Sequence, residues 1–196
     1  MIEFLEKEHL YLVNGVITPS VSEILRFIFP DKYKDVPIHI LNAKADYGTV
    51  VHEAIEKIEN EEELPKLDYV QEASIKQYFK LKEKYNIAVL EQEEMVNYQG
   101  RYAGRFDMIA NINELTSLCD IKTTATLDKE YLSWQLSFYE LATGKRFEKL
   151  YAIWLPKKEL GKLVEIERKS KEELLKKLEE FEVQKWERLL QAQQKK

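Results

Sequence analysis

The sequence predicts an α/β protein with a central mixed β-sheet, helices on its faces and a long C-terminal helix. Three observations indicate this fold class. Segments 42–63 and 69–85 repeat apolar residues with a helical period, segment 87–123 changes to a strand pattern, and a helical period returns after residue 127. Alternating periods of this kind are typical of helices and strands that share one core. No internal repeat or low-complexity linker interrupts them, so a single domain over 1–196 is expected.

Composition limits the classes of protein that the chain can belong to. Its 196 residues are 44% hydrophobic and 33% charged, which suits a globular protein with one sizeable core. A net charge of −5 argues against a surface that is basic overall. The single cysteine, Cys119, leaves no internal disulfide and no cysteine-built metal cluster. There is no apolar signal region and no run approaching eighteen apolar residues, so we expect no membrane span and a cytoplasmic location.

The first segment, 1–41, is predicted to form a hairpin and a short helix. HLYLVNGVITPS gives two short strands around Asn14-Gly15, since both residues tolerate a positive φ. Pro19 and Ser20 then begin a helix that stops at Pro30.

The core of the domain is predicted over 42–168, and a helix over 170–196 follows it. Ser170 and Glu173 have the spacing of a capping box at the start of this last helix. Within the core we expect helices over 42–63, 69–85 and 127–143, a three-stranded meander over 87–98, 102–112 and 115–123, and a strand pair over 148–156 and 162–169.

Three charged residues lie in the predicted meander, where charge is usually excluded. Asp120 and Lys122 are two positions apart, so both project from one face of their strand. Asp107 lies in the preceding strand, which a turn near 113–114 would bring alongside. Buried charges are costly unless they are paired or bind a metal. A structural Asp–Lys pair and a divalent-metal site both fit this pattern.

Two helices carry polar residues that can join this group. His52 and Glu56 are four residues apart, so they share one stripe of the helix before the meander, and His52 offers a nitrogen ligand that suits Mn²⁺ as well as Mg²⁺. Gln135 and Tyr139 have the same spacing on the helix after the meander. They fit either packing or contact with the lysine or a phosphate. Segment 143–162 also has six basic residues against two acidic ones, which fits a phosphate-binding patch or a solvated face.

Four motifs together resemble, in order and spacing, those of the RecB-like branch of the PD-(D/E)xK nuclease superfamily, above all its small phage and prophage exonuclease-type proteins. The motifs are GTVVHEAIE, YAGRFDMI, CDIKTT and WQLSFYELA. HLYLVNGVITPSVSEIL is similar to the amino-terminal motif of that group, so the likeness runs from about His9 to Tyr151. It implies a restriction-endonuclease-like core.

The resemblance also implies roles for single residues. It makes His52, Asp107 and Asp120 ligands of one or two Mg²⁺ or Mn²⁺ ions and Lys122 the catalytic lysine, with Gln135 and Tyr139 as the QxxxY element. Glu93 and Glu56 are further acidic candidates, although Glu91 and Glu94 leave the register of Glu93 open. Some relatives carry an iron–sulfur cluster on four cysteines, and this chain is expected to have none.

The function implied is metal-dependent hydrolysis of DNA in phage-type recombination or repair. An exonuclease is the leading hypothesis, and a structure-specific or single-strand endonuclease is the alternative within the same chemistry. A non-catalytic DNA-binding or assembly subunit is the alternative of another class. DNA is the expected partner. A single-strand annealing protein and a second copy of the chain are further candidate partners. The expected location is the cytoplasm of a bacterial or phage-infected cell.

Overall fold

The computed structural model describes residues 1–194. The C-terminal helix predicted over 170–196 is observed as α5, and positions 195 and 196 lie outside the described residues. The helices are α1 (Val21–Ile28), α2 (Ile38–Glu59), α3 (Tyr69–Tyr85), α4 (Lys129–Thr143) and α5 (Lys171–Gln194). The strands are β1 (Ile2–Leu5), β2 (Leu10–Val13), β3 (Val16–Thr18), β4 (Ala88–Gln92), β5 (Met95–Tyr98), β6 (Tyr102–Arg105), β7 (Met108–Ile112), β8 (Leu115–Lys122), β9 (Lys149–Trp154) and β10 (Lys162–Glu165).

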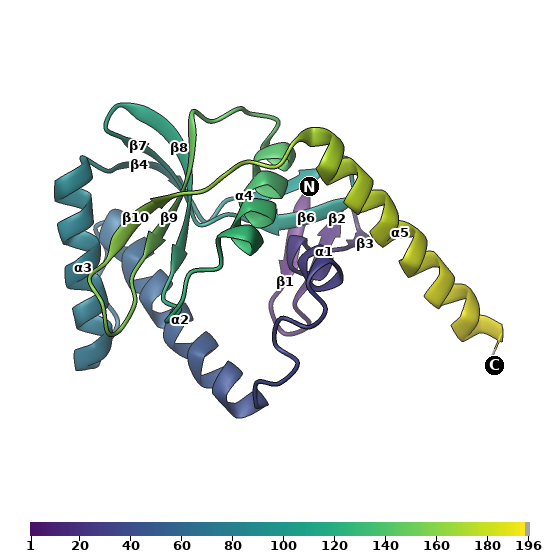
Figure 1. Ribbon diagram of the computed structural model, residues 1–196, viewed down its shortest axis with the longest axis horizontal. Helices are drawn as coiled ribbons and strands as arrows, with labels where there is room; N and C mark the ends of the chain where they lie inside the picture. Colours follow the sequence, from purple (N-terminus) through teal and green to yellow (C-terminus); the bar gives the residue numbers. More distant parts are fainter. Residues whose placement is uncertain (195–196) are drawn as a thin grey trace.

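A five-stranded mixed sheet forms the centre of the molecule, as the sequence predicted (Figure 1). Its strand order is β10-β9-β8-β7-β4. Neighbouring strands are antiparallel except for β8 and β9, which are parallel because α4 connects them. Strand β8 therefore lies in the middle of the sheet, with a neighbour on each side.

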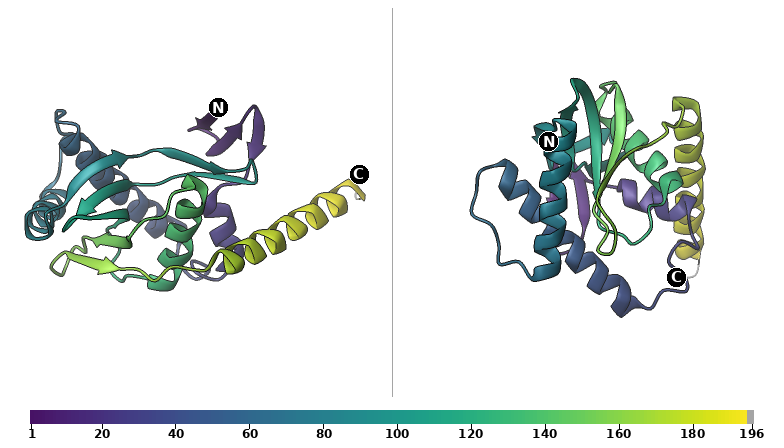
Figure 2. Two further views of the ribbon diagram at one scale, coloured as in Figure 1. Left: turned by 90° about the horizontal axis from the view of Figure 1, so that it is seen from above. Right: turned by 60° about the vertical axis from the view of Figure 1, so that its left-hand side comes forward.

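Helices cover both faces of this sheet (Figure 2). Alternate residues of β8 point to opposite faces, so Leu118 joins one hydrophobic cluster while Cys119 and Ile121 join the other. Helices α1, α4 and α5 pack with the first cluster, and α2 and α3 with the second. No helix among residues 1–194 combines the length and the apolar character that a membrane crossing requires.

The N-terminal segment forms a separate three-stranded sheet, β1-β2-β3. Its predicted hairpin is confirmed: Asn14 has φ +51° and Gly15 has φ +79°. Strand β1 was not predicted, because only Ile2 and Phe4 alternate with acidic residues before the turn. Helix α1 begins at the predicted place, where Ser20 and Glu23 form a capping box.

Two predicted strands are wrong as continuous elements. Segment 87–98 divides into β4 and β5, and segment 102–112 divides into β6 and β7. Strands β5 and β6 pair with each other as a two-stranded ribbon that leaves the main sheet. The break was not predicted, although the four residues at 91–94 are all polar, because apolar strand-forming residues stand on both sides of them.

Helix bounds differ from the predicted ones at three ends. Helix α2 begins at Ile38 directly after Pro37, whose fixed φ suits a helix start, and it ends at Glu59 because Glu61 takes a positive φ. Helix α4 begins two residues later than predicted, because the Asp128 side chain caps it by accepting from the Tyr131 N–H. The predicted bounds 69–85 and the C-terminal Gly144 of α4 are confirmed.

Helix α5 packs on the domain through its first half only. Leu174, Leu178 and Phe181 are buried there, and Arg101 forms a two-bonded ion pair with Glu182. The second half projects beyond the rest of the chain (Figures 1 and 2) and exposes Trp186.

Candidate functional site

The candidate site lies at the interruption between β4 and β5 and at the neighbouring interruption between β6 and β7. The two interruptions are at the same level. Gln92 pairs with Met108 on one side of the break, and Met95 pairs with Arg105 on the other. The break is held by two backbone hydrogen bonds: the Glu93 N–H donates to the Asp107 carbonyl at 3.0 Å, and the Phe106 N–H donates to the Glu94 carbonyl at 3.2 Å. Glu93 takes a φ of +52°. The break frees the side chains of Glu93 and Asp107 from the sheet's alternation.

Strand β8 orients two of the candidate residues through one backbone unit, that of Ile121. Strand β7 starts at Met108, which pairs with Cys119, so no residue of β7 pairs with Ile121. The Asp107 carboxylate takes that place and accepts the Ile121 N–H at 2.6 Å. The carbonyl of Ile121 lies 2.9 Å from Nε2 of His52 on α2. A carbonyl oxygen only accepts, so Nε2 carries a hydrogen, and in the neutral imidazole the lone pair is then on Nδ1.

The free lone pair of His52 faces a carboxylate. Nδ1 lies 3.6 Å from Oδ2 of Asp107, and neither atom has a hydrogen to offer the other in this tautomer. Glu93 completes the group, because one ligand atom from each of these three residues lies within 4.8 Å of the others. One imidazole nitrogen and two carboxylates form a donor set that suits Mn²⁺ or Mg²⁺. The residues therefore fit the metal ion implied by the sequence motifs.

The surroundings of this group change the pKa of Glu93. Burial, together with the nearby Asp107 charge, raises the pKa of its carboxyl to about 7, and Arg105 partly offsets the rise. Arg105 Nε lies 2.9 Å from the Glu93 carboxylate. A cation between the two carboxylates removes their repulsion, so the geometry favours an ion there.

Asp120 and Lys122 form an ion pair on the same face of β8, as their spacing predicted. Asp120 is 1% exposed, and burial raises the pKa of its carboxyl. Its Oδ2 accepts no well-oriented hydrogen bond from the described residues, so Lys122 is its only compensating contact there. Burial alone lowers the pKa of Lys122, but the Asp120 and Asp107 charges outweigh it and raise the pKa, so the ammonium stays charged.

Tyr139 and Gln135 reach the same region from α4. The Tyr139 ring is 6% exposed, and burial raises the pKa of its hydroxyl well above the ordinary value, with Asp107 and Asp120 contributing in the same direction. The Gln135 Oε1 is buried and has no hydrogen-bond partner among the described residues. Both polar groups are thus held in a largely apolar setting beside the acidic residues.

Gly104 makes room for Tyr139. A Cβ at Gly104 would lie 2.7 Å from Cε1 of Tyr139 and 3.1 Å from Cγ2 of Val21. We expect Gly104→Ala to lower the free energy of unfolding by about 1–3 kcal/mol, because neither neighbour is free to move. Thermal unfolding measures the loss. Gly48→Ala is the matched control: its Cβ would meet only Thr123 Oγ1 at 3.5 Å, so α2 should keep or gain stability. Equal melting temperatures for Gly104→Ala and the wild type would contradict the packing argument.

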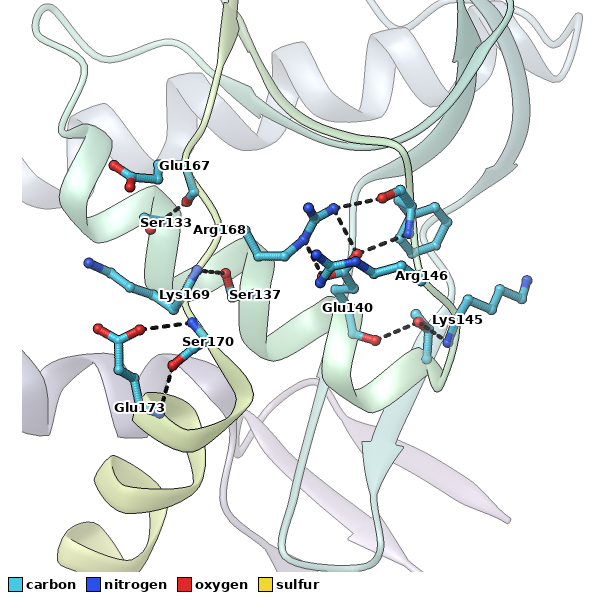
Figure 3. Close-up of polar contacts among 12 residues, drawn as sticks. Ser133, Ser137, Glu140, Lys145, Arg146, Glu167, Arg168, Lys169, Ser170 and Glu173 are labelled. Carbon is cyan, nitrogen blue, oxygen red and sulfur yellow. Dashed lines mark hydrogen bonds and ion pairs between the residues drawn. The ribbon is translucent and has the colours of Figure 1, made fainter.

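A polar cluster anchors α4 at Glu140, next to Tyr139 in sequence (Figure 3). The buried Glu140 carboxylate accepts hydrogen bonds from Arg168 at 2.6 and 3.0 Å, from the Phe147 N–H at 2.9 Å and from Arg146 at 3.2 Å. The segment before α5 is attached in the same way, because the Lys169 N–H donates to Ser137 Oγ at 2.9 Å. The cluster fixes the position of the helix that carries Gln135 and Tyr139.

The structure thus brings the predicted residues to one region, but the three residues that could hold a metal ion are not the three that the sequence motifs implied. His52 and Asp107 lie in the candidate metal group, but the third member within 4.8 Å is Glu93 and not Asp120. Glu56 contributes its charge to the surroundings of Glu93 and is not a member of the group. Of the three neighbouring glutamates, Glu93 is the one in this group, while Glu91 pairs with Lys145 and Glu94 is exposed.

Arg105 was not predicted as a site residue. Its position directly before Phe106 in the GRFD motif is the only sequence signal for its contact with Glu93. The predicted basic cluster over 143–162 does not form one patch. Four of its members pair with carboxylates and two line a cavity beside Lys122; the pairs are Lys145–Glu91, Arg146–Glu140, Lys149–Glu165 and Lys162–Glu159.

Comparisons with known proteins add information on the fold. No family model matches the chain, and no curated protein matches it. Among solved structures the fold is similar to one described as "Crystal structure of SSO0001", with a TM-score of 0.52 and 19% sequence identity. The similarity covers 91% of this chain and 80% of that one. At this identity the likeness shows a shared α/β fold.

Proposed function

We propose that this chain is a divalent-metal-dependent DNA nuclease of the RecB-like branch of the PD-(D/E)xK superfamily and that it acts as an exonuclease. One observation carries the proposal: the His52, Glu93 and Asp107 ligand atoms gather at the break in the sheet, beside the buried Asp120–Lys122 pair. The four sequence motifs and the mixed α/β fold support it.

Electrostatics indicates which chemistry this group can perform. A phosphodiester is an anion, and the carboxylates of Glu93, Asp107 and Asp120 repel it. A Mg²⁺ or Mn²⁺ ion held by His52, Glu93 and Asp107 would supply the missing positive charge and polarise a phosphate oxygen. The Ile121 backbone orients both His52 and Asp107, so the ligands are fixed before a substrate arrives.

Lys122 supplies the second positive charge. Its pairing with Asp120 keeps it protonated and directs it along the same face of β8. An ammonium in this position can bind a phosphate oxygen or orient the attacking water, and it stabilises the negative charge that grows in the transition state. Tyr139 and Gln135 border the region with a hydroxyl and an amide that can contact the substrate.

The test uses the full chain with Mg²⁺ or Mn²⁺ on linear single-stranded and duplex DNA, labelled at either end, and on covalently closed circles. Linear DNA should be cut and closed circles should persist. Lys122→Ala should lower the rate by about a hundredfold or more, because a group acting in the transition state is lost. Lys149→Ala is the matched control, since Lys149 lies on neighbouring β9 and pairs with Glu165.

Each outcome of this experiment decides something. No cleavage of any substrate would overturn the nuclease proposal in favour of a non-catalytic subunit. Wild-type rates for Lys122→Ala would remove Lys122 from the catalytic residues and with it the assigned mechanism. Cleavage of closed circles would keep the chemistry and replace the exonuclease by an endonuclease. Near-ultraviolet circular dichroism of Lys122→Ala verifies that the variant is folded.

A further inference from the structure

A cavity of about 610 Å³ opens beside Lys122. Its walls come from the segment after α1, the first half of α2, the loop between β8 and α4, and the loop after β9. Lys122 belongs both to this wall and to the ion pair with Asp120, so the cavity adjoins the candidate catalytic residues. The proposed hydrolysis does not by itself explain the cavity.

The cavity is basic although the chain as a whole has a net charge of −5. Its wall has two carboxylates, Asp128 and Glu159, and both are already paired, with Lys32 and Lys162. Five lysines line it: Lys32, Lys44, Lys122, Lys157 and Lys158.

Two of these lysines are available to a ligand. Within residues 1–194, neither Lys44 nor Lys158 has a carboxylate within 4.0 Å, so their charges remain uncompensated. Lys157 lies 3.4 Å above the ring of Tyr47, which keeps it at the wall. A polyanion is the ligand that this charge distribution attracts.

The same walls present aromatic and apolar surface. The Tyr33 side chain is 49% exposed although it lines the cavity, and Tyr131 lies nearby with Lys32 stacked 3.9 Å from its ring centre. Leu41 and Leu127 add apolar surface. Aromatic rings beside lysines are the combination on which unpaired bases stack while their phosphates are bound.

Helix α2 connects this cavity to the candidate metal group. Lys44 and Tyr47 line the cavity, and His52 belongs to the group. His52 follows Lys44 by eight positions, which is about 12 Å at the rise of an α-helix. Gly48 lies between them and faces Thr123 of the cavity wall, whose Oγ1 lies 3.5 Å from where a Cβ of residue 48 would be. One strand can therefore reach from the cavity to the metal group.

We propose that this cavity binds an unpaired DNA strand, with phosphates at Lys44 and Lys158 and a base against Tyr33. The assignment rests on the proposed function, because it places the strand next to Lys122. The cavity's volume is in the range of small-ligand sites, which suits unpaired nucleotides of one strand and not a duplex. The enzyme then prefers DNA with a single-stranded end.

The experiment measures binding without hydrolysis. Fluorescence anisotropy of a labelled dT oligonucleotide with the full chain in EDTA gives the affinity and its dependence on salt. Lys44→Glu/Lys158→Glu should weaken binding by at least about tenfold and lower the salt slope by about 1.4, since each phosphate contact on a single strand contributes about 0.7.

A matched double variant controls for the change in net charge. Lys80→Glu/Lys176→Glu alters two exposed lysines on α3 and α5 and should bind as the wild type does. Tyr33→Ala should weaken binding roughly tenfold with an unchanged salt slope, because it removes stacking and no charge.

The results separate this proposal from the nuclease proposal. Wild-type affinity in Lys44→Glu/Lys158→Glu, or tighter binding of a blunt duplex than of dT by the wild type, would overturn the cavity assignment even if DNA is cleaved. Selective loss of binding in that variant, in a chain that cleaves nothing, would support the cavity and overturn the nuclease.

Discussion

Asp107→Asn is expected to abolish divalent-cation binding and to lower the rate of DNA hydrolysis by on the order of a thousandfold, the scale of losing a transition-state-stabilising group. Asparagine keeps the shape and can still accept the Ile121 N–H through its amide oxygen, so the strand break should persist. The negative charge beside His52 is lost, and with it one of two anionic ligands. The fold should survive while the metal group does not.

Calorimetric titration with Mn²⁺ measures this effect independently of activity. A metal that binds only the folded chain also raises its stability, by about 2.7 kcal/mol at one hundred times its Kd, so the Mn²⁺-dependent rise in Tm should disappear in Asp107→Asn. Glu94→Gln is the matched control, because Glu94 lies at the same break and is exposed. Unchanged Mn²⁺ affinity in Asp107→Asn would remove Asp107 from the ligand set.

Glu140→Ala is expected to lower the free energy of unfolding by about 3–5 kcal/mol, the loss typical of breaking a buried ion pair by removing one partner. The carboxylate is 7% exposed and accepts four hydrogen bonds, and its removal leaves the Arg168 guanidinium, itself 21% exposed, with only the Phe147 carbonyl among its described partners. Urea unfolding followed by circular dichroism measures the loss.

Arg146→Ala provides the control for this cluster. Its side chain is 72% exposed and makes a single 3.2 Å bond to the same carboxylate, so it should change stability by less than about 1 kcal/mol. If Glu140→Ala lowered the free energy of unfolding as little as Arg146→Ala does, Glu140 would contribute no more than a surface residue. Because α4 carries Tyr139 directly before Glu140, Glu140→Gln, which keeps part of the bonding, should retain more nuclease activity than Glu140→Ala.

Much of the fold could be predicted from the sequence, because most elements carry local signals. The capping pairs Ser20–Glu23 and Ser170–Glu173 give two helix starts, and Asn14-Gly15 gives a hairpin. The second half of strand β8, from Leu118 on, is apolar apart from its paired charges, so its central position could also be inferred. The division of the meander could not, because it depends on which residues bond across 93–94 and 106–107, and this is a tertiary property.

The candidate site was predictable in its members and not in its grouping. The two-residue spacing of Asp120 and Lys122 requires that they share a face, and the ion pair follows from it. Whether Asp120 or Glu93 joins His52 and Asp107 depends on the break, which turns Glu93 inward through a positive φ. Three glutamates lie within four positions, so the sequence does not indicate which of them lies beside His52 and Asp107.

The hairpin between β7 and β8 constrains how the sequences of related chains can vary. Its tight turn has positive φ at Asn113 and Glu114 and lies at the opposite end of the two strands from Asp107 and Asp120. Adding a paired residue to each strand at that turn would lengthen the hairpin and leave both carboxylates in place. The interval from Asp107 to Asp120 can therefore drift in even steps, whereas the interval from Asp120 to Lys122 is fixed at two because both project from one strand face. Distant relatives should be sought by a pattern that holds the second interval and relaxes the first.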